Sequence, residues 1–304
     1  MRVRAKVSGQ AEEGDRVATV RQETGVDGRL PFLHRIAAGA RRVVRGPGTR
    51  LIYHSPVARP LRRALSSSAP RGPILVTVCG GELKGSRLWV DLSSEKYYWL
   101  GTHEERVQEF VAKHVKPGFV VYDIGAHVGF FTLLFSKLVG TAGRVYAFEP
   151  LPQNFDRLTA NIEANGLSNV EAYSLAISDE VGSATLVVDD SSLKGHLAEM
   201  TPGGAENVVR VEARTIDAMV SHAARIPDLL KIDVEGAEGR VMRGAAQTIQ
   251  ACRPRLIIEI HSLQAGREVV DGLPIPYLFQ SITTGIETRL PAAAGHYFAR
   301  SSEM

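Results

Sequence analysis

Residues 120–149 read VVYDIGAHVGFFTLLFSKLVGTAGRVYAFE, and this stretch decides which fold the sequence predicts. An apolar run over Val120–Ile124, with one acid at Asp123, has the composition of a buried parallel strand. The run breaks at Gly125, and apolar residues then recur with helical spacing. The stretch therefore predicts a strand, a glycine turn and a helix in succession.

The next predicted strand, Arg144–Phe148, ends at an acid, Glu149. In open α/β sheets, ligands bind beyond the carboxyl ends of the strands, where glycines let the backbone approach and the helix N-terminus offers unpaired N–H groups. An acid at the end of the second strand can accept hydrogen bonds from both hydroxyls of a ribose. The two strand ends together predict a nucleotide-sized site for a ligand with a free ribose.

The glycines favour S-adenosylmethionine over NAD as the cofactor. Their pattern, Asp-x-Gly-x-x-x-Gly (Asp123, Gly125, Gly129), lacks the Gly-x-Gly-x-x-Gly spacing that seats a pyrophosphate. A sulfonium nucleoside has no phosphate, but it carries an ammonium group that a carboxylate such as Asp123 can neutralise, directly or through water. The alternative is a purely structural strand, turn and helix whose acids have no ligand.

Further along the chain, strands and helices alternate, which is typical of a doubly wound, mostly parallel sheet. The expected helices are 105–114, 129–139, 152–165 and one that ends near Cys252. The expected strands are 144–148, 170–175, 228–232, 255–260, 277–282 and 296–300. Extended segments at 183–188 and 208–213 flank a polar insert, 189–207, which is expected to be mobile or to form a lid.

Charge is divided unevenly along the chain. Residues 1–72 carry fourteen Arg and one Lys against five acids, an excess of ten positive charges; the net charge of the whole chain is +3, so the remainder has an excess of seven negative charges. A basic arm can bind nucleic acid, an acidic membrane surface or a partner. Its arginines are not interleaved with aromatic residues, which favours a solvated extension over a nucleic-acid-binding arm.

These patterns predict two parts. Residues 1–73 form an Arg-rich N-terminal extension, partly disordered, with two short amphipathic helices between residues 30 and 65. Residues 74–304 form the catalytic domain, which opens with an antiparallel strand pair at 74–78 and 86–92. The two cysteines imply no disulfide framework, and neither a signal segment nor an apolar run of membrane-spanning length is evident. We therefore expect a cytoplasmic protein.

The sequence resembles the FkbM-type family of S-adenosylmethionine-dependent methyltransferases over roughly residues 75–300. The resemblance is carried by LGTHEERVQEF, VVYDIGAHVGFFT, FEPLPQNFDRLTANIEANG, LLKIDVEGAEGRVMRG and RPRLIIEIH, and DIGAHVG and KIDVEGAE are its specific blocks. It implies a Rossmann-like class I methyltransferase fold of the α/β class and S-adenosyl-L-methionine as the cofactor. It also implies O-methylation of a hydroxyl, or sometimes a carboxylate, on a small molecule, sugar, glycan or glycolipid.

The resemblance also implies which residues form the site. Glu149 matches the ribose acid, and Asp233, Glu235, Gly236 and Glu238 match the second block. His127 can contact the amino-acid end of the cofactor or brace its loop; Glu104 can reach the cofactor or only begin its helix. The expected cofactor contacts are Asp123, Gly125, Ala126, His127, Gly129, Glu149, Pro150, Glu104 and Ile177.

Methyl transfer from a sulfonium is an in-line displacement, so the protein mainly positions the nucleophile and excludes water. An alcohol must also lose its proton, whereas a carboxylate need not. Asp233 and Glu235 follow the fourth core strand and His261 follows the fifth, and we predict these three as catalytic. Within this set His261 accepts the proton, because imidazole titrates near neutral pH, and Asp233 orients the substrate or the imidazole. The alternative is that His261 caps its strand and Asp233 bonds to a loop.

These three side chains also suit Mg²⁺ or Mn²⁺ chemically, but the sequence does not require a metal and none is predicted. Acceptor specificity is expected to reside in the insert 189–207 and in a loop at 262–274.

Three other functions compete with this interpretation: a nucleic-acid methyltransferase that uses the basic arm, a non-catalytic cofactor-binding module, and a dehydrogenase. Against the first, the sequence has no Asn/Asp-Pro-Pro-Tyr/Phe/Trp block and no aromatic-rich basic segment in the core. We expect a small-molecule or carbohydrate acceptor, no stable nucleic-acid partner and no membrane span. A homodimer is one role open to the N-terminal segment.

Overall fold

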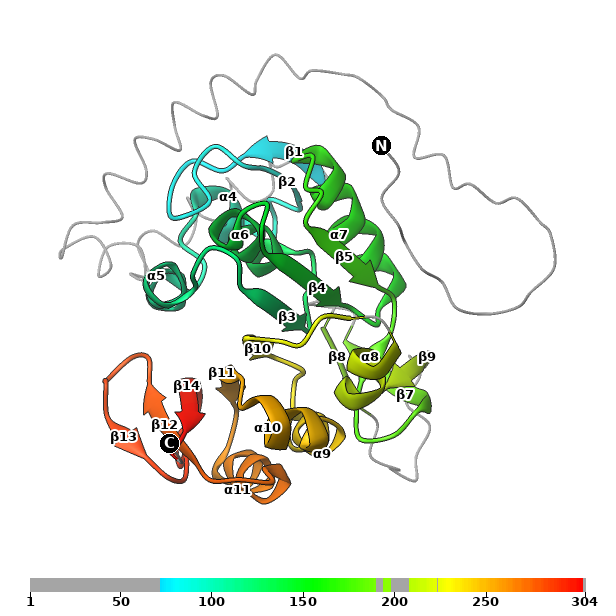
Figure 1. Cartoon of the computed structure of the whole chain (residues 1–304). Coiled ribbons are helices and arrows are strands. Elements are labelled where there is room, and N and C mark those ends of the chain that lie inside the picture. Colours follow the sequence, from blue (N-terminus) through cyan, green and yellow to red (C-terminus); the bar gives the residue numbers. More distant parts are fainter. Residues whose placement is uncertain (1–71, 190–193, 198–207, 223, 303–304) are drawn as a thin grey trace, which may run out of the picture. The chain divides into compact units, whose positions relative to one another are not determined.

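The computed structural model describes residues 72–189, 194–197, 208–222 and 224–302. The helices expected between residues 30 and 65, and most of the insert 189–207, lie outside these residues. The chain divides between His103 and Glu104 into two compact units (Figure 1). The strand pair at the start of the described chain thus groups with the N-terminal unit, whereas the sequence placed it in the catalytic domain. The predicted division at residue 73 stays a prediction.

The described part of the N-terminal unit is a small sheet followed by one short helix. β1 (Ile74–Thr77) pairs antiparallel with β2 (Arg87–Val90), which confirms the expected strand pair. α4 (Lys96–Leu100) was not expected. It ends at Gly101, which has a φ of 69° and lies so close to Gly80 that an added Cβ would be 1.9 Å from the Gly80 carbonyl oxygen.

The larger unit is built on an eight-stranded mixed sheet. Its strands, in their order across the sheet, are β13 (Glu287–Thr288), β12 (Tyr277–Ser281), β14 (Gly295–Ser301), β11 (Arg255–Ile260), β10 (Leu229–Ile232), β3 (Val120–Ile124), β4 (Arg144–Phe148) and β5 (Val170–Tyr173). The five strands from β11 to β5 are parallel, and β14, β12 and β13 continue the sheet antiparallel. The mostly parallel sheet and the strands expected along it are confirmed.

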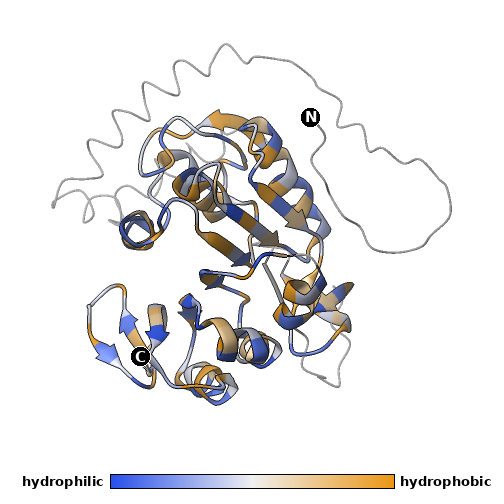
Figure 2. Ribbon diagram, in the orientation of Figure 1, coloured by the Kyte–Doolittle hydropathy of each residue, from blue (hydrophilic) through white to orange (hydrophobic). Residues whose placement is uncertain are grey.

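Helices pack on both faces of this sheet, as a doubly wound fold requires. Their bounds are α5 (Glu105–His114), α6 (Phe130–Val139), α7 (Pro152–Ala164), α8 (Ile216–His222), α9 (Glu238–Gly244), α10 (Ala246–Cys252) and α11 (Leu263–Gly272). Tyr122 of β3 shares a buried cluster with Val241 of α9 and Ile249 of α10, whereas Asp123 points to the opposite face and meets Thr132 of α6. Every residue of β3 is buried, and Figure 2 shows this strand mostly in hydrophobic colours.

No helix within the described ranges combines the length and the apolar character needed to cross a bilayer.

A second, four-stranded sheet follows β5. Its strands are β6 (Ala176–Ile177), β7 (Gly182–Asp189), β8 (Lys194–Leu197) and β9 (Val208–Arg214), in the order β6-β9-β7-β8. The extended segments expected at 183–188 and 208–213 are confirmed. β8 lies within the insert 189–207 and pairs antiparallel with β7. Residues 194–197 thus form the edge of a sheet, and the expectation that the insert is mobile or forms a lid stays a prediction.

The expectation of a loop at 262–274 is wrong, because residues 263–272 form the helix α11. The Ser262 side chain accepts a hydrogen bond from the Ala265 N–H at 3.1 Å and caps the helix. The last glycine of α11 permits close packing: a Cβ on Gly272 would lie 2.9 Å from the Gly239 carbonyl oxygen of α9. A serine cap before apolar residues at helical spacing was the signal in the sequence.

Gly125 sets the distance between the chain segments that leave β3 and β10. It adopts a φ of 79°, and a Cβ there would lie 1.8 Å from the Asp233 carbonyl oxygen. The Asp233 N–H in turn donates to the Ile124 carbonyl at 3.1 Å. Only glycine permits this approach, which places the turn after β3 directly against the residues after β10.

We expect Gly125→Ala to lower the free energy of unfolding by about 3 kcal/mol or more, because the new methyl group must displace the Asp233 backbone. Gly140→Ala is the matched control, since Gly140 has a φ of 64° and nothing within 4 Å of an added Cβ. Its loss should be about 1 kcal/mol, from backbone strain alone. Urea unfolding measures both; equal losses would contradict a tight approach of the two segments.

Candidate functional site

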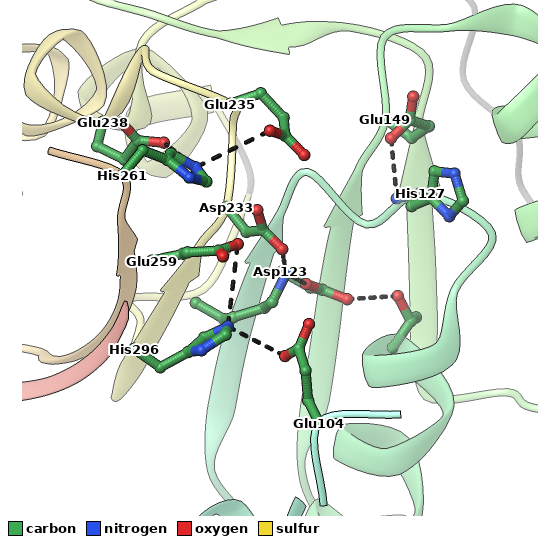
Figure 3. A network of polar contacts seen from close by, with 12 residues as sticks. Glu104, Asp123, His127, Glu149, Asp233, Glu235, Glu238, Glu259, His261 and His296 are labelled. Atoms are coloured by element: carbon green, nitrogen blue, oxygen red, sulfur yellow. Dashed lines mark hydrogen bonds and ion pairs between the residues drawn. The ribbon is translucent and has the colours of Figure 1, made fainter. Parts of the chain in front are cut away.

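The charged residues of the candidate site gather at the carboxyl edge of the parallel strands (Figure 3). They come from elements far apart in the chain: Glu104 at the start of α5, Asp123 on β3, Glu149 after β4, Asp233 and Glu235 after β10, Glu238 on α9, Glu259 and His261 at the end of β11, and His296 on β14. The parallel arrangement brings them together, because the carboxyl ends of neighbouring strands meet at one edge.

Several site residues are held in an unusual backbone conformation. Among the described residues, four that are not glycine have a positive φ, and three of them are Glu104 (46°), His127 (51°) and Glu235 (51°). This geometry costs about 1 kcal/mol or more for an L-residue and persists only where surrounding contacts impose it. The fold therefore fixes the direction of these three side chains.

Glu149 anchors the loop that follows β3. Its Oε2 accepts the His127 N–H at 2.8 Å and its Oε1 accepts the Leu151 N–H at 3.0 Å. Burial raises the pKa of Glu149 to about 7, even though these hydrogen bonds act to lower it. Asn154 Nδ2 also donates to Oε1 at 3.4 Å, whereas Oε2 keeps a second lone pair, so Glu149 can brace the loop and still accept a hydrogen bond from a ribose hydroxyl through Oε2.

Backbone contacts fold the rest of this loop over the end of β4. The N–H groups of Gly125 and Ala126 both donate to the Phe148 carbonyl at 3.0 Å. Gly129 lies against α7, where an added Cβ would be 2.6 Å from Leu158 Cδ1. The loop thus has the expected glycine geometry. Ile177 is buried in β6 and Pro150 is half-buried beyond Glu149, and their contacts with a cofactor stay predictions.

Asp123 is completely buried and bonded within the protein. Thr132 Oγ1 donates to its Oδ2 at 2.6 Å, and Lys231 Nζ lies 3.7 Å from its Oδ1. Burial raises the pKa of Asp123, while Lys231 and Thr132 act in the opposite direction. Asp123 has no exposed surface, and its expected contact with the ammonium group of a cofactor, directly or through water, stays a prediction.

Lys231 is the central cation of the network, and it pairs with acids rather than pointing away from the core. Its Nζ lies 3.1 Å from Asp233 Oδ2 and 5.4 Å from the centre of the Phe131 ring. Burial acts to lower the pKa of Lys231, but the carboxylates of Asp233 and Asp123 outweigh it and raise the pKa. A lysine inside an otherwise apolar strand, two residues before a site acid, was the available signal.

Asp233 and Glu259 form a carboxyl pair at the ends of two neighbouring strands, β10 and β11. Burial acts to raise the pKa of Asp233, but Lys231 outweighs it and the pKa is lowered. Burial raises the pKa of Glu259 to about 8, and the neighbouring Asp233 adds to the effect. Near neutral pH, Asp233 is therefore ionised and Glu259 carries the proton of the pair. Glu259 was not expected, because it lies inside a strand rather than after it.

His296 closes the network from the antiparallel side of the sheet. Its Nε2 lies 3.1 Å from Glu104 Oε2 and 3.9 Å from Glu259 Oε2. Burial acts to lower the pKa of His296, but Glu104 outweighs it and the pKa is raised. Glu104 thus binds a histidine within the protein, and its predicted contact with the cofactor stays a prediction. No local motif marked His296.

His261 lies where the sequence placed it, at the end of β11, and it faces two acids. Its Nε2 is 3.8 Å from Glu238 Oε1 and 4.0 Å from Glu235 Oε2. No hydrogen bond joins His261 to Asp233 in the described structure, but ligand atoms of Asp233, Glu259 and His261 lie within 4.8 Å of one another. Asp233, Glu259 and His261 therefore have the spacing to hold a divalent cation. The sequence had suggested Asp233, Glu235 and His261 as the chemically suitable set.

The chain is similar to known methyltransferases in sequence. Residues 123–284 match the family model described as the methyltransferase FkbM domain. The chain is 29% identical over 178 residues to the 31-O-demethyl-FK506 methyltransferase FkbM of Streptomyces tacrolimicus, covering 49% of this chain and 68% of that protein. It is 26% identical over 222 residues to the hexuronic acid methyltransferase AglP of Haloferax volcanii, covering 72% and 87%.

A similarity to solved structures was also found. The crystal structure of a methyltransferase FkbM from Methylobacillus flagellatus KT aligns with a TM-score of 0.40 at 14% identity, covering 83% of this chain and 60% of that one.

We expect the affinity for S-adenosylhomocysteine to rise with pH through about 7 and then level off. Ribose hydroxyls donate to the ionised form of Glu149, whose pKa is about 7 in the free protein. The gain between about pH 6 and pH 8 should be about tenfold, because one pKa unit corresponds to a tenfold change in the ionised fraction below the midpoint.

Titration calorimetry at several pH values measures this dependence. Glu149→Gln should bind weakly at every pH and lose the slope. Glu171→Gln is the control, because Glu171 pairs with Arg144 on the sheet surface at 3.3 Å, and it should keep the slope. An affinity of the unmodified protein that is flat across pH 7 would contradict the role of Glu149.

Proposed function

Since the chain belongs to the FkbM-type methyltransferase family and is an S-adenosylmethionine-dependent methyltransferase, we propose that it methylates a hydroxyl oxygen on a sugar or another small polyhydroxylated molecule. One observation carries this proposal: Gly125 holds the glycine loop, which Glu149 braces, directly against the backbone of Asp233. A donor half and an acceptor half thus share one edge of the sheet. One relative is named for a 31-O-demethyl substrate and another for a hexuronic acid, and both names support an oxygen acceptor.

The donor half consists of the loop after β3 and the acid after β4. S-adenosylmethionine, when bound, supplies an electrophilic methyl group on a sulfonium. Glu149 accepts hydrogen bonds from the ribose, and the glycines at 125 and 129 let the backbone approach the nucleoside. His127, held at a φ of 51° by its N–H bond to Glu149, keeps the loop in place.

The acceptor half supplies orientation and a path for one proton. Ionised Asp233, held by Lys231, accepts a hydrogen bond from a hydroxyl next to the reacting one, and this contact turns the reacting oxygen toward the methyl group. As the oxygen–carbon bond forms and the sulfur–carbon bond breaks, the hydroxyl proton passes to His261, which is 35% exposed and can release it to water. Glu238 lies beside the imidazole, with its Oε1 3.8 Å from Nε2.

The rival functions are less well supported. The acids at the strand ends repel a phosphate backbone, which argues against a nucleic-acid acceptor. A non-catalytic module would keep cofactor binding but show no methyl transfer, so the two activities must be measured separately.

Both cysteines of the chain are free thiols, and we place the enzyme in the cytoplasm on that ground.

We expect Asp233→Asn to reduce methyl transfer by about 100-fold or more, because the amide cannot orient the hydroxyl as an ionised acceptor does. Cofactor affinity should change by less than about threefold, since the donor half is intact. The measurements are release of S-adenosylhomocysteine with a panel of hexosides and hydroxylated macrolactones, and calorimetry with the cofactor. Glu109→Gln, at an exposed position of α5, is the control. Full turnover by the Asp233 variant would remove this residue from the reaction.

We expect excess EDTA to leave the initial rate unchanged, because an in-line displacement needs no metal and Lys231 already neutralises Asp233 at 3.1 Å. Rates are compared before chelation, after chelation, and after adding back Mg²⁺ or Mn²⁺. A loss that Mn²⁺ restores would instead assign a cation to Asp233, Glu259 and His261.

A further inference from the structure

We infer that the acceptor edge, defined as Asp233, Glu235, Glu259 and His261, binds an uncharged polyhydroxylated ring and discriminates against acceptors that carry a carboxylate or a phosphate. This inference rests on the proposed function, because it concerns the same edge of the sheet. It goes further by naming the charge class of the acceptor.

Each basic group of the network lies between two acids (Figure 3). Lys231 Nζ lies 3.1 Å from Asp233 and 3.7 Å from Asp123. His296 Nε2 lies 3.1 Å from Glu104 and 3.9 Å from Glu259. His261 Nε2 lies 3.8 Å from Glu238 and 4.0 Å from Glu235. Six carboxyl groups therefore surround one ammonium and two imidazoles. No basic group of this described network is left without an acid.

An anionic acceptor needs a cation at the point where it loses water. A carboxylate is stabilised at a binding site mainly by charge-assisted hydrogen bonds, most often from the paired N–H groups of an arginine. The network drawn in Figure 3 contains no arginine, and its cations are already neutralised. A carboxylate placed beside Asp233 and Glu235 would meet charges of its own sign at short range.

Protonation of the acids at this edge does not make the edge positively charged. Burial raises the pKa of Glu238 and of Glu259, in the latter to about 8. When either acid binds a proton it becomes a hydrogen-bond donor to a hydroxyl, but it does not become a cation. Near neutral pH the edge is therefore neutral or negative.

Two of the six acids have no contact with solvent. Asp123 and Glu238 are both 0% exposed, and one oxygen of each, Oδ1 and Oε2, has no hydrogen-bond partner among the described residues. Burial raises the pKa of both acids. Their contacts with Lys231 and His261 come from inside the protein, so these two basic groups are already engaged before an anion approaches.

A neutral ring finds suitable partners at the same edge. Asp233, Glu235 and His261 are partly exposed, with 23%, 29% and 35% of their side chains accessible. Ionised carboxylates are strong acceptors for hydroxyl groups, and Glu259 can donate its proton. One relative is named for a hexuronic acid, so the charge at this edge points to a different acceptor for this chain.

Glu235 is the residue we assign to this discrimination. Its φ of 51° fixes its direction toward His261, and it is the more exposed of the two acids beside that imidazole. Glu235→Gln removes one charge of the acid pair and keeps the shape of the side chain. Only Glu238 then remains as an acid beside the imidazole, so an anionic group meets less repulsion there.

The test compares methyl glycosides of glucose, glucosamine and glucuronic acid, which share one ring and carry zero, positive and negative charge. Binding to the full chain saturated with S-adenosylhomocysteine is measured by ligand-observed NMR titration. We expect the glucuronoside to bind about tenfold or more weakly than the glucoside, and the glucosaminide to bind at least as well as the glucoside. In Glu235→Gln the gap should shrink by about threefold or more, and in Glu109→Gln it should not change.

Equal or tighter binding of the glucuronoside to the unmodified protein overturns the inference, and so does a gap that Glu235→Gln leaves unchanged. If the protein binds S-adenosylhomocysteine but none of the three rings, the edge is not a sugar site; the inference then falls while the methyltransferase assignment stands. If the protein does not bind S-adenosylhomocysteine, the proposed function itself fails.

Discussion

The close approach of Gly125 to the Asp233 carbonyl is the constraint on which the rest of the site depends. A side chain at residue 125 would separate the turn after β3 from the residues after β10, because its Cβ would lie 1.8 Å from that oxygen. The same contact brings together a loop that suits a nucleoside and an edge that suits a hydroxyl. Catalysis by in-line transfer requires this adjacency, since the reacting atoms must meet within about 3–3.5 Å.

Around this contact the protein has to accommodate many acids in little space. Neighbouring carboxylates cannot all ionise unless cations or shared protons separate them. Lys231, His261 and His296 supply that separation, each between two acids. The arrangement keeps Asp233 ionised, leaves a proton on Glu259, and anchors Glu104 to the antiparallel part of the sheet. The same arrangement of acids and basic groups thus sets the ionisation of Asp233 and the charge of the acceptor that the site can bind.

Several elements could be predicted from local patterns. The strand at 120–124, the glycine turn, the acid at 149 and the residues after β10 follow from hydropathy and spacing, and each lies where it was expected. The helix at 263–272 was missed, although the serine cap before it marks its start. The strand at 194–197 was missed because only its pairing with β7 defines it.

The sequence by itself determined the α/β class, the parallel core, the family and the two halves of the site, because these follow from local hydropathy patterns and from short motifs of neighbouring residues. Only the tertiary structure decided which side chains meet. Lys231 reaches Asp123, and His296 reaches Glu104 and Glu259, across parts of the chain that are distant in sequence. Burial then shifts the pKa of Glu149 and Glu259 toward neutrality. A linear sequence contains neither the neighbours across a sheet nor the loss of solvent, and these two factors set the charge of the site.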